Sequence, residues 1–260
     1  CHMAATIVID AGHGGSDSGA VYNGRLEKDD NLRLALAVGD LLKQAGYNVI
    51  YTRTEDVFDS PTEKAAIANR AGADYFVSFH RNSSPYANTY SGVETLVYTD
   101  SGVRGELARS VNKQLEAAGF QNLGVEERKN LAVLRRTGMP AILIETGFIN
   151  TDQDNQTFDN RFQDIARAIA VGIEDVVGGE PGGTGSSSGK VYRVQTGLFR
   201  RYGNALYMMQ QLMEEGYEAE IVENGEYFAV QVGDYVTLSD AEKAQRQLRA
   251  LGYDTLIVTV

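Results

Sequence analysis

The segment 178–189 limits what this chain can fold into more than any other feature. Its twelve residues are Gly, Ser, Thr and Pro apart from one glutamate. Such a composition offers no apolar side chains to a core, and it behaves as a flexible tether with an r.m.s. span of about 20 Å. The rest of the 260-residue chain is therefore predicted to form two domains, 4–177 and 190–260, joined by this linker.

The second of these domains contains an internal repeat at a shift of 36 residues. Its first half has strand patterns at residues 192–196 and 218–222, with a helix pattern at 204–215 between them. Two such halves predict a small α+β domain of βαββαβ order, whose four-stranded sheet carries both helices on one face. The repeat pairs Val194 with Val230, Gln195 with Gln231, Gly197 with Gly233, Ala205 with Ala241, Leu212 with Leu248 and Gly216 with Gly252.

The first domain alternates short apolar runs with helical patterns. The predicted strands are residues 6–10, 47–52, 75–79, 93–98, 132–134 and 142–145, and the predicted helices lie around residues 28–45, 107–115 and 162–176. Alternating strands and helices predict a layered α/β domain, in which helices flank a largely parallel, twisted sheet.

Composition excludes several classes of protein. No uncharged apolar run approaches the roughly 18–20 residues that a membrane-spanning helix needs, so we expect no membrane partner. The formal net charge is −11, which lacks the basic footprint of nucleic-acid binding. The only cysteine is Cys1, within a leading tripeptide that is typical of a cloning remnant. Cysteine nucleophiles, disulfides and cysteine metal sites are therefore excluded.

The residues that follow the predicted strands offer a metal site. His13 and His80, the two histidines outside that tripeptide, and Glu145 all come at the carboxyl ends of strands, and Glu27 begins the first helix. Ligands of α/β sheets bind at this edge. Two imidazoles and a carboxylate are the ligands of many catalytic zinc sites, whose bound water becomes more acidic. A second carboxylate then serves as the base, and spacing leaves open which glutamate has which role.

Simpler interpretations remain for each of these residues. A histidine after a strand is more often packed or exposed than a ligand, and Glu27 could merely favour the positive end of a helix dipole. Glu145 follows three apolar residues, where a carboxylate without a functional partner is costly. Other catalytic motifs fail, because Asp17 interrupts both a dinucleotide-binding fingerprint and a nucleophile elbow. A phosphate-binding loop is excluded by Val191 after Lys190.

The first domain resembles the zinc-dependent N-acetylmuramoyl-L-alanine amidases of the amidase-3 type. The matching motifs are residues 10–20, 27–28, 31–32, 52–53, 78–82 and 140–149, in this order within residues 4–177. The resemblance implies that His13, Glu27 and His80 bind one Zn²⁺ ion and that Glu145 is the catalytic carboxylate. It further implies hydrolysis of the amide between N-acetylmuramic acid and L-alanine, so that peptidoglycan bearing stem peptides is the substrate.

Two positions depart from the pattern of that family. Ala11 stands where proline is common, and Arg81 stands where a small residue is common. Some members carry an inhibitory helix after the strand of the second histidine. The stretch 81–91 is too short for such a helix, and we predict an uninhibited site.

Residues 190–260 resemble a SPOR domain, a module that recognises peptidoglycan glycan strands stripped of stem peptides. Strand alternation turns Arg193, Gln195, Tyr227 and Gln231 to the open face of the sheet, where amides and an aromatic ring could bind sugar. These side chains could equally be merely solvated. An RNA-binding version of the same fold is disfavoured, because these residues are net acidic.

The order of the two domains is similar to that of amidases that digest the mother-cell wall of endospore-forming bacteria. Such a protein is expected in the cell wall or outside the cell, after accumulation in the mother-cell cytoplasm, and as a monomer. The chain opens directly on a strand, so either a secretion signal was removed or none is made. Two alternatives remain: a non-catalytic wall-binding protein, and a zinc peptidase or deacetylase that acts on peptidoglycan.

Overall fold

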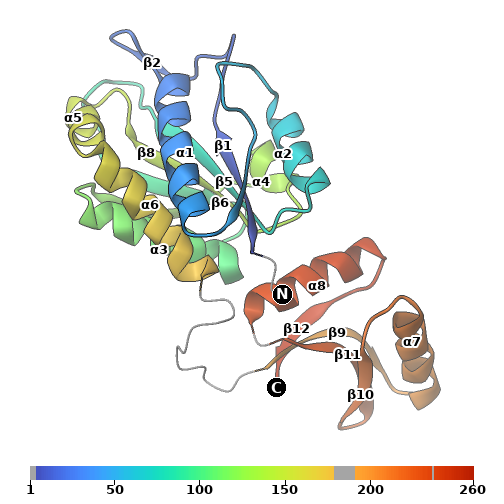
Figure 1. The fold of residues 1–260 in the computed structure, drawn as a ribbon. Coiled ribbons are helices and arrows are strands. Elements are labelled where there is room, and N and C mark those ends of the chain that lie inside the picture. The colour runs from blue at the N-terminus through green and yellow to red at the C-terminus, as the bar shows by residue number, and fades with distance from the viewer. Residues whose placement is uncertain (1–3, 179–190, 236) are drawn as a thin grey trace. The chain divides into compact units, whose positions relative to one another are not determined.

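The computed structural model describes residues 4–178, 191–235 and 237–260 (Figure 1). The chain divides into two compact units, Cys1–Gly182 and Gly183–Val260. Most of the predicted linker, from residue 179 onward, lies outside the described residues.

The first unit is built on a six-stranded sheet of order β4-β1-β5-β8-β6-β7. Its strands are β1 (Thr6–Ala11), β4 (Asn48–Tyr51), β5 (Tyr75–Asn82), β6 (Val93–Val97), β7 (Asn122–Glu127) and β8 (Ala141–Phe148), and a hairpin of β2 (Val21–Tyr22) and β3 (Arg25–Leu26) follows β1. Strands β4, β1, β5 and β8 are parallel to one another, whereas β6 pairs antiparallel to β8. The prediction of a largely parallel sheet is confirmed.

Helices cover both faces of this sheet (Figure 1). They are α1 (Glu27–Gln44), α2 (Pro61–Arg70), α3 (Gly102–Ala117), α4 (Ala132–Arg135), α5 (Asp152–Asn160) and α6 (Phe162–Val177). Successive residues of β1 point to opposite faces, so Ile7 and Ile9 pack with α1, α3 and α6, whereas Val8 packs with α2 and α4. A continuous apolar run is what a strand buried on both faces requires.

One sequence prediction for this unit is wrong, and helices α2 and α5 and strand β7 were not predicted. The predicted strand at 132–134 is helix α4, whose Val133 and Leu134 pack into the core on the side of α2. A short apolar run fits a buried helix turn as well as a strand. The missed strand β7 lies at the edge of the sheet, where β6 is its only neighbour among the described strands, and its residues are half-buried or exposed. Such a strand carries little of the apolar pattern on which prediction depends.

The second unit has the predicted βαββαβ order, in a sheet of order β10-β11-β9-β12 with antiparallel neighbours throughout. Its elements are β9 (Tyr192–Phe199), α7 (Tyr202–Glu214), β10 (Ala219–Asn224), β11 (Tyr227–Tyr235), α8 (Leu238–Ala250) and β12 (Leu256–Thr259). Its core repeats like the sequence: three repeat-related pairs are completely buried. They are Val194 and Val230, Ala205 and Ala241, and Leu212 and Leu248.

None of the helices in the described ranges is both long and apolar enough to cross a membrane.

Candidate metal centre and acid–base site

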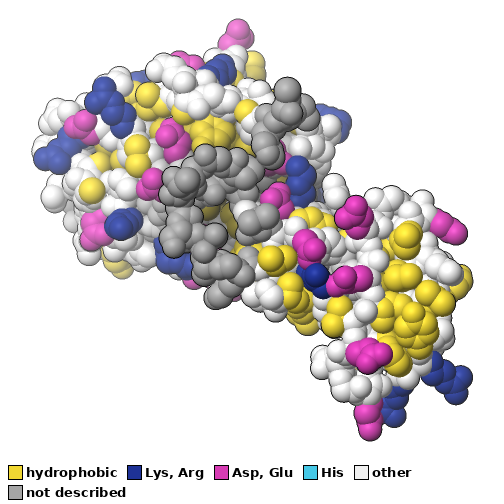
Figure 2. Space-filling view, turned by 60° about the horizontal axis from the view of Figure 1, so that its bottom comes forward, with side chains coloured by type: hydrophobic (Ala, Val, Ile, Leu, Met, Phe, Trp, Pro, Cys, Tyr) yellow, Lys and Arg dark blue, Asp and Glu magenta, His cyan; other side chains and the backbone are white. Residues whose placement is uncertain are grey.

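The structure brings His13, Glu27 and His80 together at the edge of the first sheet where β1 and β5 end. His13 lies in the turn after β1, Glu27 is the first residue of α1, and His80 is near the end of β5. One ligand atom from each lies within 4.8 Å of the others, which makes the three side chains a candidate metal centre. In Figure 2, which brings the bottom of Figure 1 forward, no described histidine is visible, because the site lies at the other end of the strands.

Glu27 is the centre of this cluster. Its Oε2 lies 3.2 Å from His13 Nε2, and its Oε1 lies 3.0 Å from His80 Nδ1. Burial acts to raise the pKa of Glu27, but the hydrogen bonds and charges of the two imidazoles outweigh it and hold this pKa far below its usual range. Glu27 is therefore an ionised, buried carboxylate placed between two imidazoles.

Three amide donors fix the direction of the Glu27 side chain. The backbone N–H of Ala20 donates to Oε2 at 2.9 Å, and that of Arg81 donates to Oε1 at 3.1 Å. The side-chain amide of Asn31, one helical turn along α1, donates to Oε1 at 3.2 Å. Because the donors come from three separate segments, the carboxylate is oriented whether or not an ion is present.

His13 has an unusual backbone and a well-placed partner. Its φ of 62° lies in the left-handed region, which non-glycine residues seldom adopt. Its Nδ1 is hydrogen-bonded to Asp17 Oδ2 at 2.8 Å, so Nε2 is left to face Glu27. Burial works against a charged imidazole, but the bonds to Glu27 and Asp17 raise the pKa of His13 to about 9. Sequence analysis used Asp17 only to exclude other motifs and missed this role.

Two positions beside these side chains, Gly12 and Gly19, leave no space for a Cβ atom. A Cβ atom at Gly12 would lie 2.3 Å from Nε2 of His80. A Cβ atom at Gly19, whose φ is +62°, would lie 2.6 Å from both Glu27 Oε2 and a ring carbon of His13. The turn after β1 can therefore pass against the ligands only where side chains are missing.

Two cations lie beneath this turn and hold its carbonyl oxygens. Arg53 donates through Nε to the carbonyl of Ala11 at 3.0 Å and through its second terminal nitrogen to that of Gly12 at 3.0 Å. Lys64 Nζ donates to the carbonyls of Ala11 at 2.6 Å and His13 at 3.4 Å. Three successive carbonyls are thus fixed by what we call the cation pair, Arg53 and Lys64, which sequence analysis did not single out for this role.

The charge of Lys64 is balanced by Asp10, and both side chains are almost completely buried. Lys64 Nζ lies 3.0 Å from Asp10 Oδ1, while Thr52 and Ser78 each donate a hydroxyl to Asp10 at 2.6 Å. Burial would raise the pKa of Asp10, but the Lys64 charge and the two hydroxyls lower it below its usual value. A fully hydrogen-bonded ion pair therefore supports the metal centre from below.

Glu145 lies on β8, directly opposite His80 on β5 and Glu94 on β6. Cross-strand neighbours point to the same face, so His80, Glu145 and Glu94 form a row across three strands. Glu145 Oε2 is buried and has no hydrogen-bond partner among the described residues. Burial raises the pKa of Glu145 to about 7, which is the property of a carboxylate that can accept and release a proton near neutral pH.

Glu94 extends this row of carboxyl groups and was also missed by sequence analysis. Asn82 Nδ2 donates to its Oε2 at 3.3 Å, and Glu126 of β7 is its hydrogen-bond partner on the other side. Burial and the neighbouring Glu126 raise the pKa of Glu94 to about 7. The carboxyl group therefore keeps its proton to higher pH than an ordinary glutamate does.

Arg81 takes the place of the small residue expected from the resemblance, and the structure accommodates it. Its guanidinium lies 2.7 Å from Asp30 Oδ2, donates to Asn155 Oδ1 at 2.8 Å and lies 4.3 Å above the ring of Phe158. The side chain is thus directed away from Glu27, while the backbone N–H supports it. The substitution leaves the metal centre intact.

In the second unit, the residues predicted to bind glycan alternate along the strands with the core residues Val194 and Val230, which places them on the sheet face away from the helices. Contrary to the expectation of an open position, Gln231 is nearly buried there, with 6% of its surface exposed. Arg193 is ion-paired with Glu220 and with Asp234, whose Oδ1 lies 2.6 Å from Arg193 Nε. A terminal nitrogen of Arg193 also donates to Gln231 Oε1 at 3.5 Å. These side chains surround a small hollow of about 130 Å³. Gln195 is directly opposite Gln231 across β9 and β11.

Tyr227, the fourth predicted glycan-binding residue, lies on β11. Its hydroxyl accepts a hydrogen bond from Arg200 at 3.1 Å. Two carboxylates, Glu220 and Asp234, neutralise Arg193. Sequence analysis missed both, because nothing in the repeat pattern indicates them.

Comparison with protein families gives two matches. Residues 7–175 match the family of N-acetylmuramoyl-L-alanine amidases, and residues 188–259 match the SPOR domain. Two bacterial relatives match 83% of this chain and 84% of their own length at 34% identity. They are a sporulation-specific N-acetylmuramoyl-L-alanine amidase of Bacillus subtilis and the amidase CwlM of Bacillus licheniformis.

Solved structures resemble the first unit. An N-acetylmuramoyl-L-alanine amidase of Clostridium difficile aligns over its whole length and 69% of this chain, with a TM-score of 0.65 and 33% identity. The amidase AmiC2 of Nostoc punctiforme aligns over 96% of its length and 66% of this chain, with a TM-score of 0.62 and 35% identity.

Proposed function

Because the chain belongs to the N-acetylmuramoyl-L-alanine amidase family and carries a C-terminal SPOR domain, it hydrolyses peptidoglycan at the muramoyl–alanine amide, and we propose that it uses one zinc ion held by His13, Glu27 and His80. Among the possibilities that the sequence allowed, a non-catalytic wall-binding protein is thereby excluded. The ligand set, the role of Glu145 and the glycan-binding face are our proposal.

The donor set fits zinc better than other common ions. Two imidazole nitrogens and one carboxylate oxygen match the three protein ligands of catalytic zinc sites, whereas Mg²⁺ and Ca²⁺ prefer oxygen. Asp17 and the amides around Glu27 supply the outer hydrogen bonds that zinc ligands need. A zinc ion held there supplies Lewis acidity, which polarises the amide carbonyl and makes a water molecule more acidic.

Glu145 is the proposed general base and acid. It takes a proton from the attacking water as the water oxygen bonds to the carbonyl carbon of the lactyl group. It returns that proton to the alanine nitrogen as the C–N bond breaks, which leaves a free amine and a carboxylic acid, and the acid then loses its remaining proton to the solvent. The observation that carries this role is the unpartnered Oε2 of Glu145, on the strand beside His80. Glu27, whose oxygens are all engaged, is poorly suited to move a proton.

Product analysis tests the proposed chemistry. Purified peptidoglycan treated with the protein should release stem peptides that begin with alanine, and a zinc chelator should abolish this release until zinc is restored. Peptides with other amino termini, or released acetate, would identify a peptidase or a deacetylase instead. His80→Ala should lose bound zinc in elemental analysis, and an unchanged zinc content would contradict its role as a ligand.

The proposed role of the SPOR domain is to hold the enzyme on glycan strands without stem peptides, through the face that carries Arg193, Gln195, Tyr227 and Gln231. Such tethering raises the local concentration of the enzyme near uncut bonds. Removal of residues 190–260 should reduce sedimentation with peptidoglycan and spare hydrolysis of a soluble muramoyl peptide. Sedimentation that survives the deletion would show that the first unit provides the binding.

A place in sporulation is proposed from the relatives. The Bacillus subtilis relative is described as sporulation-specific, and it shares both regions of this chain in one alignment. We propose that the protein accumulates as a monomer in the mother-cell cytoplasm and reaches the wall at lysis. Fractionation of sporulating cells before and after lysis tests the location, since early wall-bound protein would contradict it, and sedimentation velocity tests the monomer.

A further inference from the structure

The connection between β5 and β6 passes over the end of the strand that carries Glu145. Residues 83–92 form this connection, which we call the β5–β6 loop. Strands β5 and β6 lie on either side of β8 in the sheet. Since β5 is parallel and β6 antiparallel to β8, both ends of the loop lie at the edge where β8 ends. The loop must therefore cross the carboxyl end of β8, beside Glu145.

Hydrogen bonds fix this loop to the segment that follows β8. The side chain of Asn150 accepts from the backbone N–H of Ser84 at 3.2 Å and donates to its carbonyl at 2.7 Å. The backbone N–H of Asn88 donates to the carbonyl of Asn150 at 2.9 Å, and the Thr151 hydroxyl donates to the carbonyl of Tyr90. No helix occurs in the loop, all of whose residues are described. Its backbone is thus a defined scaffold, although it has no regular secondary structure.

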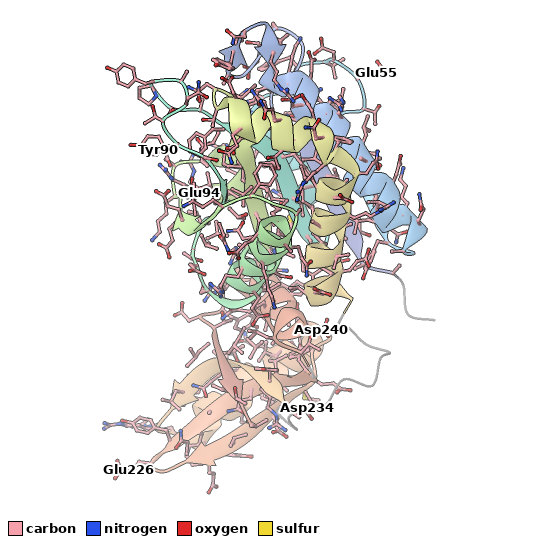
Figure 3. The ribbon with its side chains drawn as sticks, turned by 90° about the vertical axis from the view of Figure 1, so that its left-hand side faces the viewer. Glu55, Tyr90, Glu94, Glu226, Asp234 and Asp240 are labelled. Carbon is pink, nitrogen blue, oxygen red and sulfur yellow. The ribbon has the colours of Figure 1, made fainter. Side chains whose placement is uncertain are left out.

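This scaffold exposes two aromatic rings. Tyr86 is 78% exposed and Tyr90 is 58% exposed. The ring of Tyr90 rests on that of Phe148, the last residue of β8, with 5.9 Å between ring centres. Figure 3 shows Tyr90 and Glu94 at the same side of the unit, so the exposed ring and the row of carboxyl groups share one edge. Neither ring is part of the core, and a fixed loop offers them to a ligand at low entropic cost.

From this placement we infer that the β5–β6 loop is a sugar-binding subsite of the catalytic unit, in which Tyr86 and Tyr90 stack on pyranose rings of the glycan strand being cut. The inference rests on the proposed function of the metal centre and Glu145. The amide to be cut joins a sugar to a peptide, so sugar rings must lie within a few ångströms of Glu145. The axial C–H groups of a pyranose form an apolar face that packs on the negative face of an aromatic ring.

The chemistry of the loop favours sugar over stem peptide. A stem peptide carries charged groups, which bind best to charged side chains of opposite sign. The β5–β6 loop has none: residues 83–92 contain no Lys, Arg, Asp or Glu. Apart from Pro85, Ala87 and Gly92, its residues carry aromatic, hydroxyl or amide groups, which suit a neutral ligand with many hydroxyl groups. This subsite is distinct from the glycan-binding face proposed for the SPOR domain, because it binds the glycan strand whose amide is being hydrolysed.

Competition by glycan tests the subsite in the full chain. The substrate is a soluble muramoyl peptide with one sugar, and the inhibitor is a set of glycan oligosaccharides without peptides. At enzyme concentrations far below that of the inhibitor, binding to the SPOR domain does not deplete it. The oligosaccharides should inhibit the unaltered protein competitively. Tyr86→Ala and Tyr90→Ala should each raise the inhibition constant by roughly threefold to tenfold.

Matched variants separate stacking from general damage. Tyr86→Phe and Tyr90→Phe keep the ring and should retain inhibition near that of the unaltered protein. Tyr207→Ala, which removes a 64% exposed tyrosine of the second unit, should change nothing. Zinc content and melting temperature verify folding. Because Tyr86 is mostly exposed, its variant keeps the test open even if Tyr90→Ala, which loses the Phe148 contact, is unstable.

Three results would overturn the inference. They are an absence of inhibition by oligosaccharides, equal inhibition constants in the alanine variants, and a loss confined to turnover of the soluble substrate, which would indicate peptide recognition. Failure of the proposed function looks different, since the unaltered protein would then show no zinc-dependent hydrolysis of the soluble substrate.

Discussion

The two units of this protein build their functional surfaces in opposite ways. In the first unit, the proposed metal ligands and the proposed base come from four separate segments, and each of these positions occurs once. In the second unit, a duplicated sequence presents related side chains twice, so that Gln195 and Gln231 face each other across the central strand pair. A site assembled once has no substitute for a lost group, whereas on a repeated surface we expect the proposed glycan contacts to be shared between equivalent residues.

The ion pairs of the two units also differ, since the pair in the first unit is buried and those in the second unit lie at the surface. The ion pair of Asp10 and Lys64 is buried, and breaking such a pair leaves an uncompensated charge away from water. The pairs that Arg193 makes with Glu220 and Asp234 lie at the surface, where solvent reduces their contribution. Substitutions in the buried ion pair and the proposed acid–base site of the first unit should therefore have larger effects than substitutions on the surface of the second unit.

The largest effect is expected for Glu145→Gln. Loss of a general base should lower kcat for a soluble muramoyl peptide by about 10²- to 10⁴-fold, while zinc content stays the same. Glu106→Gln, an exposed glutamate on α3, is the matched control and should leave kcat unchanged. A decrease smaller than about tenfold would place the base elsewhere.

Lys64→Met should have the next largest effect, because it removes one member of the cation pair and leaves Asp10 unpaired. We expect unfolding free energy to fall by about 3–5 kcal/mol in urea titrations. Zinc affinity, measured by chelator competition on the folded fraction, should fall about 10- to 100-fold. Lys113→Met on exposed α3 surface is the control, and Lys64→Arg should recover most of the affinity. An unchanged zinc affinity would contradict support of the ligand turn by Lys64.

Smaller effects are expected from the repeated surface. Gln195→Ala and Gln231→Ala should each weaken sedimentation with stripped glycan by about two- to tenfold, the value of one hydrogen bond, and the double variant should lose more. Hydrolysis of the soluble substrate serves as the internal control and should not change. If either single variant abolished sedimentation, the idea of shared binding would fail.

The smallest effect concerns Glu94→Gln and pH. The folded pKa of Glu94 is raised to about 7, so between its ordinary value near 4.5 and pH 7 only the unfolded chain releases this proton. Stability is lost as pH rises through that window. The glutamine variant lacks this penalty and should melt at a higher temperature than the unaltered protein at pH 8. The two should melt alike at pH 4. An equal difference at both values would argue against titration of Glu94.

The sequence allowed prediction where a pattern is local. Apolar runs such as the one before Asp10 predicted buried strands, and the repeat predicted the whole second sheet. The prediction of a strand at 132–134 was wrong, because three apolar residues fit either a strand or a turn of helix.

Contacts between distant segments were not predictable in the same way. Lys64 lies in an amphipathic helix, where lysine is usually a surface residue, and only the tertiary fold places it beneath the turn of His13. Glu94 likewise acquires its role from partners on other strands, whereas the Asp17 contact with His13 is local, four residues apart, but no motif marked it. Motifs pointed to the proposed ligands and base, whereas the groups that support them can be identified only from the three-dimensional structure.

The cation pair has a consequence for how the protein would gain and lose the proposed zinc ion. Many small zinc domains melt when stripped of metal, because the ion itself holds the backbone. Here Arg53 and Lys64 grip the carbonyls of Ala11, Gly12 and His13 from the protein side. Chelation should therefore yield an intact apoenzyme that reloads without refolding. Under the proposed release at lysis, the protein would not need to carry its ion with it, since it can bind zinc after it leaves the cell.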